Sequence, residues 1–293
     1  CPYNTAPLAP LNAKLILVVH DLIYLKSWSE LPPSISIYQT LGRIYRRWVV
    51  PRVIRKADVL LTVSEYTKSE MISRFKISPD AIHVIPNAVS NTWFVEQPLS
   101  IEQRGNYCLT VAGEAPSKNI KRLIKAFSMG VGSYPEGFKL KIVGIKASLH
   151  HKFKQIAEAN NIAHRVEFEG FVSDEKLRSL YRNSDCFVFA SLFEGFGIPL
   201  IEAMASGVPI ACSNTTSIPE VVGEAAITFD PLDEMQIAKA IGRIVADKKL
   251  ATELVSTGLA RSQRFNEANI NKQFEEFWSV VNESQKENSN IGS

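Results

Sequence analysis

The sequence predicts an α/β protein with two domains, each built on a parallel sheet covered by helices. Short continuous apolar runs, as in strands buried on both faces, alternate with segments whose apolar residues recur at helical spacing. Strict alternation of strands and helices implies parallel sheets with right-handed crossovers. The 293 residues are enough for two domains of ordinary size. We place a first domain over residues 1–95, a polar linker over 96–106 and a second domain over 107–268.

The first domain opens with a proline-rich segment and contains three predicted strands. These lie at Leu15–Val19, Ala57–Ser64 and Ile82–Asn87, with helices expected over Ser36–Lys56 and from Ser64 onward. Ser64 is a suitable N-cap, because its hydroxyl can accept from an N–H group left unpaired at a helix start.

The second domain alternates more regularly. Strands are expected at Cys108–Ala112, Leu140–Val143, Val166–Glu169, Cys186–Ala190, Val208–Cys212 and Ala226–Phe229. Helices are expected at Asn119–Met129, His151–Asn160, Asp174–Asn183, Ile198–Ser206 and Glu234–Ala246. A terminal helix over 269–284 carries Phe274, Phe277, Trp278 and Val281 at helical spacing, and 285–293 reads as a flexible polar tail.

Composition excludes several classes of protein. The formal net charge of +3 is too small to indicate a nucleic-acid partner. No apolar run approaches the length of about 18 residues that a membrane-spanning helix needs. The four cysteines show no CxxC spacing, which favours small core residues in a reducing compartment over a disulfide frame or metal site.

The most informative stretch is residues 186–213, CFVFASLFEGFGIPLIEAMASGVPIACS. It predicts a buried strand, a tight turn over Glu194–Gly197, a short helix from Ile198 and a second buried strand. Ligands of open α/β sheets bind at the carboxyl ends of strands, where Glu194 is expected. Glu202 follows a little over one turn into the helix, near the same crevice.

The turn also supplies backbone donors. The helix N-terminus that follows Gly197 attracts phosphate through unpaired N–H groups and the helix dipole. Glycine lets a ligand approach the backbone closely. A diphosphate on the backbone of Phe196, Gly197 and Ile198, with hydroxyls on the two carboxylates, describes a nucleotide-sugar site.

The run E-G-F-G-I-P-L-I-E followed by A-M-A-S-G-V-P-I resembles the signature of retaining glycosyltransferases of the GT-B fold, in family 4 (glycosyl transferases group 1). The resemblance implies two Rossmann-like domains facing a cleft, with the terminal helix returning to the first domain. It also implies that Glu194 approaches the transferred sugar and that Glu202 accepts hydrogen bonds from ribose hydroxyls. The alternative is a turn of another Rossmann-like protein, with two incidental glutamates.

Two more loops carry the resemblance. In GEAPSKN, residues 113–119, Gly113 opens a loop whose lysine, here Lys118, binds the donor diphosphate in the family. Its ammonium would offset charge on the leaving diphosphate; alone, it reads as a solvated lysine near a helix start. Relatives place an arginine near this lysine, so we expect another basic residue, from the first domain or Lys121 or Arg122, to reach in, or activity to be low. Phe171 and Val172 lie in a segment whose backbone faces the nucleotide base in the family.

The run KLILVVHDLIYL, residues 14–25, resembles a segment well inside the family's first domain. The earlier glycine-rich loop of the family has no counterpart, so the resemblance implies an incomplete N-terminal domain. The alternative is a naturally short first domain. His20 matches a histidine that lies near the transferred sugar and the acceptor in the family. By itself, a lone histidine there is a polar cap at a strand end.

Residues 43–56 form a basic segment of the first predicted helix. Its cations, interleaved with aliphatic and aromatic residues, are Arg43, Arg46, Arg47, Arg52, Arg55 and Lys56. Such a segment can lie on an anionic membrane surface. The alternatives are a solvated helix with an ordinary core face and a basic patch for phosphorylated acceptors.

The resemblance implies transfer of a sugar, mannose favoured, from a nucleotide sugar (GDP-mannose or a UDP-sugar) to a glycan or lipid-linked glycan acceptor. Retention of configuration and a role in polysaccharide biosynthesis are implied with it, because the motifs look most like bacterial mannosyltransferases of surface-polysaccharide assembly. Catalytic roles fall to Glu194, Lys118 and His20. No cofactor, metal or nucleic-acid partner is expected. The expected location is cytoplasmic, or peripheral at the cytoplasmic face of the inner membrane. The alternative function is a non-catalytic or truncated homologue that binds nucleotide or scaffolds a partner glycosyltransferase.

Overall fold

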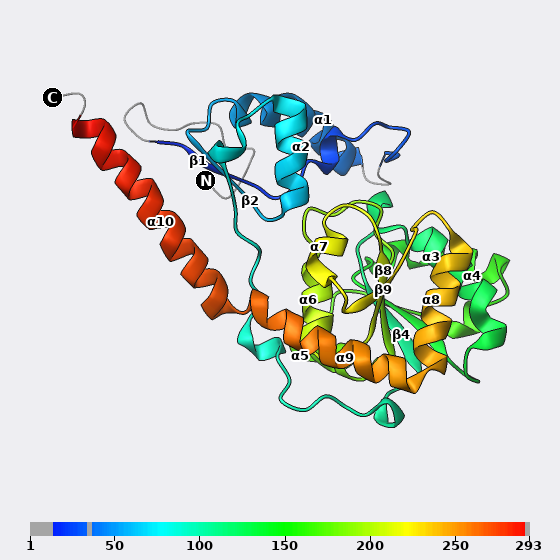
Figure 1. Cartoon of the computed structure of the whole chain (residues 1–293). Helices are drawn as coiled ribbons and strands as arrows, with labels where there is room; N and C mark the ends of the chain where they lie inside the picture. The colour runs from blue at the N-terminus through cyan, green and yellow to red at the C-terminus, as the bar shows by residue number, and fades with distance from the viewer. Residues whose placement is uncertain (1–13, 34–36, 291–293) are drawn as a thin grey trace.

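The computed structural model describes residues 14–33 and 37–290, with side chains described as far as residue 282. It contains two parallel sheets, a three-stranded one ordered β1-β2-β3 and a six-stranded one ordered β6-β5-β4-β7-β8-β9. Figure 1 shows the two units side by side, connected by an extended linker and by the long C-terminal helix. The proline-rich start of the chain lies outside the described residues.

The first unit is small and is covered on both faces of its sheet. Its elements are β1 (Ile16–Val19), α1 (Ile37–Ile54), β2 (Val59–Thr62), α2 (Glu65–Phe75) and β3 (Ile82–Val84). Val50 and Val53 of α1 pack with Leu17 and Leu60 on one face. Burial on both faces explains why these strands read as continuous apolar runs.

The terminal helix α10 (Glu267–Asn290) covers the other face of the first sheet, as Figure 1 shows. Ile270, Phe277 and Val281 of this helix pack against Leu61 and Ile85. Phe277 also lies edge-on to the His83 ring, at 5.1 Å between ring centroids. The helix continues through residues 285–290, which the sequence predicted as a flexible tail.

The second unit carries the six-stranded sheet between two helical layers. Its strands are β4 (Tyr107–Val111), β5 (Lys139–Val143), β6 (Val166–Glu169), β7 (Cys186–Phe189), β8 (Ile210–Ser213) and β9 (Ala226–Phe229). Its helices are α3 (Ile120–Gly130), α4 (His150–Ala159), α5 (Asp174–Arg182), α6 (Ile198–Ala205), α7 (Ile218–Val222), α8 (Glu234–Ala246) and α9 (Lys248–Ser262).

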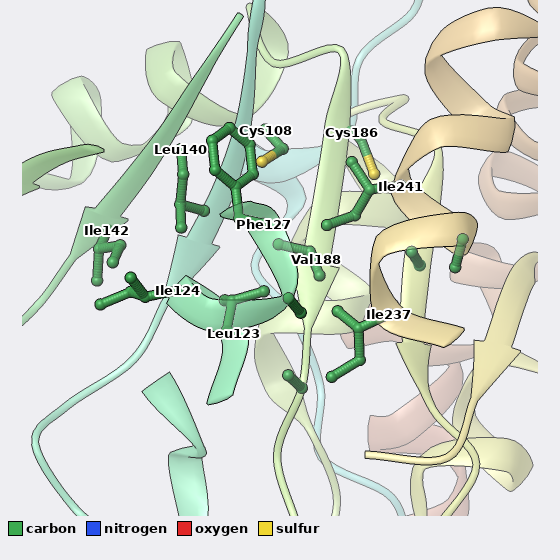
Figure 2. Packing of buried hydrophobic residues seen from close by; sticks show 14 of the residues in the cluster. Cys108, Leu123, Ile124, Phe127, Leu140, Ile142, Cys186, Val188, Ile237 and Ile241 are labelled. Atoms are coloured by element: carbon green, nitrogen blue, oxygen red, sulfur yellow. The ribbon is translucent and has the colours of Figure 1, made fainter. Parts of the chain in front are cut away.

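The two faces of this sheet bury separate apolar clusters. In one, Phe127 of α3 and Ile241 of α8 pack on Cys108 and Val188, as Figure 2 shows. The other cluster lies under α5, α6 and α7 and includes Trp93, which the sequence placed before the linker. The expected β/α alternation is therefore the architecture observed.

Two helices of this unit were missed by the sequence analysis. The α7 segment was read as a loop because it is only five residues long. The helix α9 combines buried small residues with a polar remainder, and it approaches α6 closely at Gly258, where a Cβ would lie 3.3 Å from Met204 Cγ. Small residues at a close helix contact leave a weak apolar pattern in the sequence.

Within residues 14–33 and 37–290, no helix combines the length and the apolar character needed to cross a bilayer.

The basic segment of α1 is not a uniformly solvated face. The Arg43 side chain is buried, and its guanidinium donates to the carbonyl oxygens of Leu31 and Lys26, each at 2.6 Å. Arg47 donates to Lys26 and Tyr24 carbonyls at 2.7 and 3.0 Å. The expectation that Arg43 belongs to an exposed basic face is therefore wrong, because this side chain instead ties α1 to the loop after β1.

Replacing Arg43 by Met should destabilise the first unit. The change keeps the volume of the side-chain stem but removes the donor to the Leu31 carbonyl oxygen, and a buried acceptor left unsatisfied costs about 1–3 kcal/mol. Chemical unfolding followed by amide exchange within β1 and α1 would measure the loss. The exposed Lys56→Met is the control and should be near neutral; equal stability of both variants would contradict the assignment.

Candidate active site

The site lies where the order of strands in the large sheet reverses. β4 pairs with β5 on one side and with β7 on the other. The chain therefore adds β5 and β6 on one side of β4, and then β7, β8 and β9 on the other side. All strands are parallel, so the loops that follow β4 and β7 emerge at the same edge and leave a crevice between them. Lys118 lies on the first of these loops and Glu194 on the second.

Lys118 and Glu194 contact each other directly. Lys118 Nζ lies 2.6 Å from Glu194 Oε1, and both side chains are mostly buried, with 26% and 12% of their areas exposed. A lysine ammonium has three N–H donors, so two remain for another anion at this place. The two predicted catalytic side chains are thus brought together across 76 residues of sequence.

Asn119 holds the Lys118 loop in place. Its backbone is left-handed, with φ of 58°, and its buried side chain donates to the carbonyl oxygens of Ala190 (3.0 Å) and Pro231 (2.7 Å). Asparagine tolerates this conformation better than most residues. The sequence analysis predicted Asn119 only as the start of a helix. Its position directly after Lys118 was the feature that could have indicated a role in holding this loop.

The Glu194 loop is fixed by hydroxyl groups from the segment after β8. Ser217 Oγ donates to the carbonyl oxygens of Glu194 and Phe196, each at 3.1 Å, and Thr216 Oγ1 accepts from Glu194 N–H at 3.3 Å. The resemblance places residues 217–220 at the same crevice, but nothing in this Ser-Thr-rich loop indicates the hydrogen bonds that Thr216 and Ser217 make with the Glu194 loop.

Gly197 lets the loop enter α6. Its φ is +111°, a conformation open mainly to glycine, and it stands at the N-cap without a capping side chain. Among the described residues, no acceptor pairs with the amide N–H of Phe196 or Gly197. The Phe196 ring itself packs on Phe265 in the core, at 5.7 Å between centroids. The Phe196 side chain is therefore part of the core, so only its backbone remains for the predicted donor site, and Ile198 is partly exposed beside it.

Glu202 lies in a different environment from Glu194. Its Oε2 accepts from the hydroxyl of the fully buried Tyr181 at 3.0 Å. Burial raises the pKa of Glu202, and the hydrogen bond from Tyr181 opposes that rise. Glu202 thus points toward α5, whereas Glu194 points toward the β4 loop. This places the two carboxylates along the crevice rather than facing each other.

The loop after β6 flanks the Glu202 end of the crevice. Phe171 is 79% exposed, and Val172 packs partly against the apolar cluster that contains Tyr181. At the other end, Gly113 follows β4, and a Cβ there would meet no atom within 4 Å. The predicted donor-binding residues therefore line one edge of the sheet.

His20 comes from the first unit. It follows β1 and its side chain is exposed, while its carbonyl oxygen meets the Glu194 loop. A Cβ at residue 195 would lie 2.0 Å from His20 O, so the two units approach backbone to backbone at Gly195. Asp21, beside this contact, accepts from Ile23 N–H at 2.9 Å, and burial raises the pKa of its carboxyl. The structure thus brings His20 next to the loop that carries Glu194.

The cation expected to supplement Lys118 is neither Lys121 nor Arg122 in this structure. Arg122 pairs with Glu234 at 3.2 Å, and Lys121 is exposed. From the first domain, which was also expected to supply such a residue, the Lys26 ammonium lies 5.0 Å from the centre of the ring of Phe193, the residue before Glu194. Because Lys26 also pairs with Glu70, at 3.0 Å, its charge is partly offset.

A cavity of about 460 Å³ adjoins this region between the two units. Glu30 and Pro32 line it from the first unit, and Pro116, Lys121 and Leu192 line it from the second. Lys118 and Glu194 do not line it, but Pro116 and Leu192 belong to the same two loops.

Comparison with known sequences identifies the family. Residues 91–261 match the profile described as Glycosyl transferases group 1, and residues 3–92 match Glycosyltransferase Family 4. The O-antigen chain mannosyltransferase B of Escherichia coli is 32% identical over 225 residues, which are 74% of this chain. The chain spans 59% of the length of that protein.

Solved structures share the fold. Sucrose-phosphate synthase from Thermosynechococcus elongatus superposes with a TM-score of 0.74 at 22% identity, over 94% of this chain and 69% of the other. Anabaena Alr3699/HepE in complex with UDP and glucose gives 0.73 at 21%, over 91% and 71%. The predicted α/β architecture of the GT-B type is confirmed. With more than half of its residues matched by the profile, this chain belongs to the glycosyl transferases group 1 family.

Proposed function

We propose that the chain binds a nucleotide sugar in the crevice and transfers its sugar to a glycan acceptor with retention of configuration. The observation that carries the proposal is the Lys118–Glu194 pair at 2.6 Å, on the loop that also carries the unpaired amides of Phe196 and Gly197 and the backbone contact between Gly195 and His20. A cation, backbone donors and a carboxylate are thus presented by two neighbouring loops. That set suits a leaving diphosphate on one side and a sugar on the other.

The donor's parts find complementary groups along the crevice. The diphosphate would accept from the amides of Phe196 and Gly197 and from the two free N–H donors of Lys118. Glu202 would accept from ribose hydroxyls, with the base beside Phe171 and Val172. Glu194 would then lie by the sugar. This order follows the sequence of groups along the sheet edge, from Lys118 to Tyr181.

The chemistry we propose is a front-face displacement. The bond from the sugar's anomeric carbon to the diphosphate breaks while a bond to the acceptor oxygen forms on the same face, and the leaving diphosphate takes the acceptor proton. Lys118 and the turn amides stabilise the negative charge as it develops on the diphosphate. Loss of this stabilisation raises the barrier more than it weakens binding.

We further propose mannose as the sugar and GDP-mannose as the favoured donor, because the E. coli relative is named a mannosyltransferase. A UDP-sugar is the second candidate donor, since the HepE structure holds UDP. The neighbouring cavity, lined from both units, supports a glycan acceptor that enters beside the Lys118 and Glu194 loops.

We also propose that α1 rests on an anionic membrane, consistent with a lipid-linked acceptor. Exposed apolar residues recur every three or four positions along it: Ile37, Tyr38, Leu41, Ile44, Tyr45 and Trp48, each at least half exposed. Arg46, Arg52, Arg55 and Lys56 are exposed around them, and α1 contains no acidic residue. Apolar side chains ringed by cations suit an interface with negatively charged lipids.

Titration calorimetry with GDP, UDP and ADP should show binding of one nucleotide, and Glu202→Ala should weaken it by about 1.5–3 kcal/mol, the value of a hydrogen bond to a charged group. Because burial raises the pKa of Glu202, wild-type affinity should fall as the pH is lowered toward that raised value, when the acceptor becomes protonated. Glu202→Gln should lack this fall. Unchanged binding by Glu202→Ala would remove this residue from the site.

Lys118→Ala should lower the turnover of a nucleotide sugar by roughly 10²–10³-fold, with a smaller effect on nucleotide affinity. The control is Lys154→Ala, which changes an exposed lysine of α4 that does not line the cavity. Product analysis should show the anomeric configuration of the donor. Equal losses in turnover and affinity would mean that Lys118 only binds, and a folded chain that binds nucleotide without turnover would favour a non-catalytic homologue.

Vesicles containing anionic phospholipid should bind the chain, and neutral vesicles should not. Leu41→Ser with Tyr45→Ser removes two large apolar side chains, each worth about 1.5–3 kcal/mol when fully buried, and should abolish sedimentation with vesicles. Met129→Ser, which removes an exposed apolar side chain of α3, should not. Equal binding to both vesicle types by the wild-type chain would contradict the proposal.

A further inference from the structure

Glu220 of the second unit is hydrogen-bonded to a helix of the first. Its Oε1 accepts from Glu65 N–H and its Oε2 from Tyr66 N–H, each at 3.0 Å, across about half of the chain. Figure 1 shows α7, which carries Glu220, lying just below α2. Both oxygens of one carboxylate therefore accept hydrogen bonds from consecutive amides of the other unit.

The N-terminus of α2 has backbone N–H groups that this carboxylate can pair. The first N–H groups of a helix have no acceptor within it. Ser64 Oγ, the N-cap of α2, satisfies only Thr67 N–H, at 3.1 Å. Glu220 supplies the acceptors for Glu65 and Tyr66, and its negative charge is favourable at the positive end of the helix dipole. The start of α2 is completed only when the two units meet.

The N-terminal end of α7 is hydrogen-bonded to the Glu194 loop. Ser217, directly before α7, donates to the carbonyl oxygens of Glu194 and Phe196. Arg261 of α9 donates to Val221 O at 2.6 Å and to Glu220 O, which holds α7 from behind. The short helix therefore links α2 on one side to the Glu194 loop on the other.

A close backbone contact accompanies the link. Gly195, in the middle of the loop that Ser217 holds, meets the His20 carbonyl with no room for a Cβ. This contact and the Glu220 hydrogen bonds join the same two units at neighbouring points. If the units separate, both contacts break together.

We propose that Glu220 is a positioning residue whose hydrogen bonds to α2 hold the two units in the arrangement competent for transfer. Through α7 and Ser217, these hydrogen bonds also hold the Glu194 loop in position relative to the first unit. The inference rests on the proposed transferase function. Glu220 touches no substrate. Its loss leaves the nucleotide-holding groups, Lys118 and Glu202, in place, while the first unit with His20 is free to move away from Glu194.

The test compares Glu220→Ala and Glu220→Gln with Glu224→Ala, which removes an exposed carboxylate four residues away that accepts from no amide of α2. Amide hydrogen exchange in the full chain should rise by roughly tenfold at Glu65 and Tyr66 in Glu220→Ala, as expected when one hydrogen bond is lost. Glu220→Gln keeps one neutral acceptor and should be intermediate. Exchange at these two amides should be unchanged in Glu224→Ala.

Kinetics provide the second arm. The kcat for sugar transfer should fall roughly ten- to hundredfold in Glu220→Ala through lost alignment, while the Kd for the nucleotide stays at its wild-type value. Unchanged exchange at Glu65 and Tyr66, or a kcat equal to wild type, would overturn the proposal. A wild-type chain that transfers no sugar would contradict the proposed function instead. The amide exchange at Glu65 and Tyr66 would still decide whether Glu220 links the two units.

Discussion

The site depends on the reversal of strand order at β4. Because β5 and β6 are placed on one side of β4 and β7, β8 and β9 on the other, the carboxyl ends of β4 and β7 are neighbours in space. Parallel strands release their loops at the same edge, so Lys118 and Glu194 meet although 76 residues separate them. Burial on both faces keeps β7 rigid, which gives the Glu194 loop a fixed starting point.

Glu194 and Glu202 are identical side chains in different environments, which suits them to different ligand groups. Glu194 is ion-paired with Lys118, and its backbone is fixed by Thr216 and Ser217. Glu202 is shielded by the sheet and hydrogen-bonded to Tyr181, and burial raises its pKa. A charge that is paired in the free protein can exchange its partner when an anion binds, whereas a shielded acceptor is better suited to neutral hydroxyl groups.

Besides the helix that connects them, the two units touch through groups of several kinds among the described residues. Gly195 meets His20, Glu220 accepts from the start of α2, and Lys26 lies over Phe193. Val63 of the first unit adds an apolar contact, because it packs in the cluster under α5, α6 and α7. Interfaces of that kind between the units of one chain generally allow relative motion. The connecting helix α10 is long and packs on the first sheet through Ile270, Phe277 and Val281.

The sequence by itself determined the alternation of strands and helices, the reversal site's two polar loops and the identity of Lys118, Glu194 and Glu202 as candidates. The elements, Glu194 and Glu202 follow from local patterns: apolar runs, helical spacing, and glycines at a turn. Lys118 follows from the resemblance of its loop to that of the family. Only the tertiary structure decided that Arg43 is buried, that Arg122 turns to Glu234 rather than toward Lys118, and that Glu220 caps α2. The physical reason is range. A hydrogen bond between side chains and amides about 155 residues apart leaves no periodicity in the sequence, because it exists only after both sheets have formed and met.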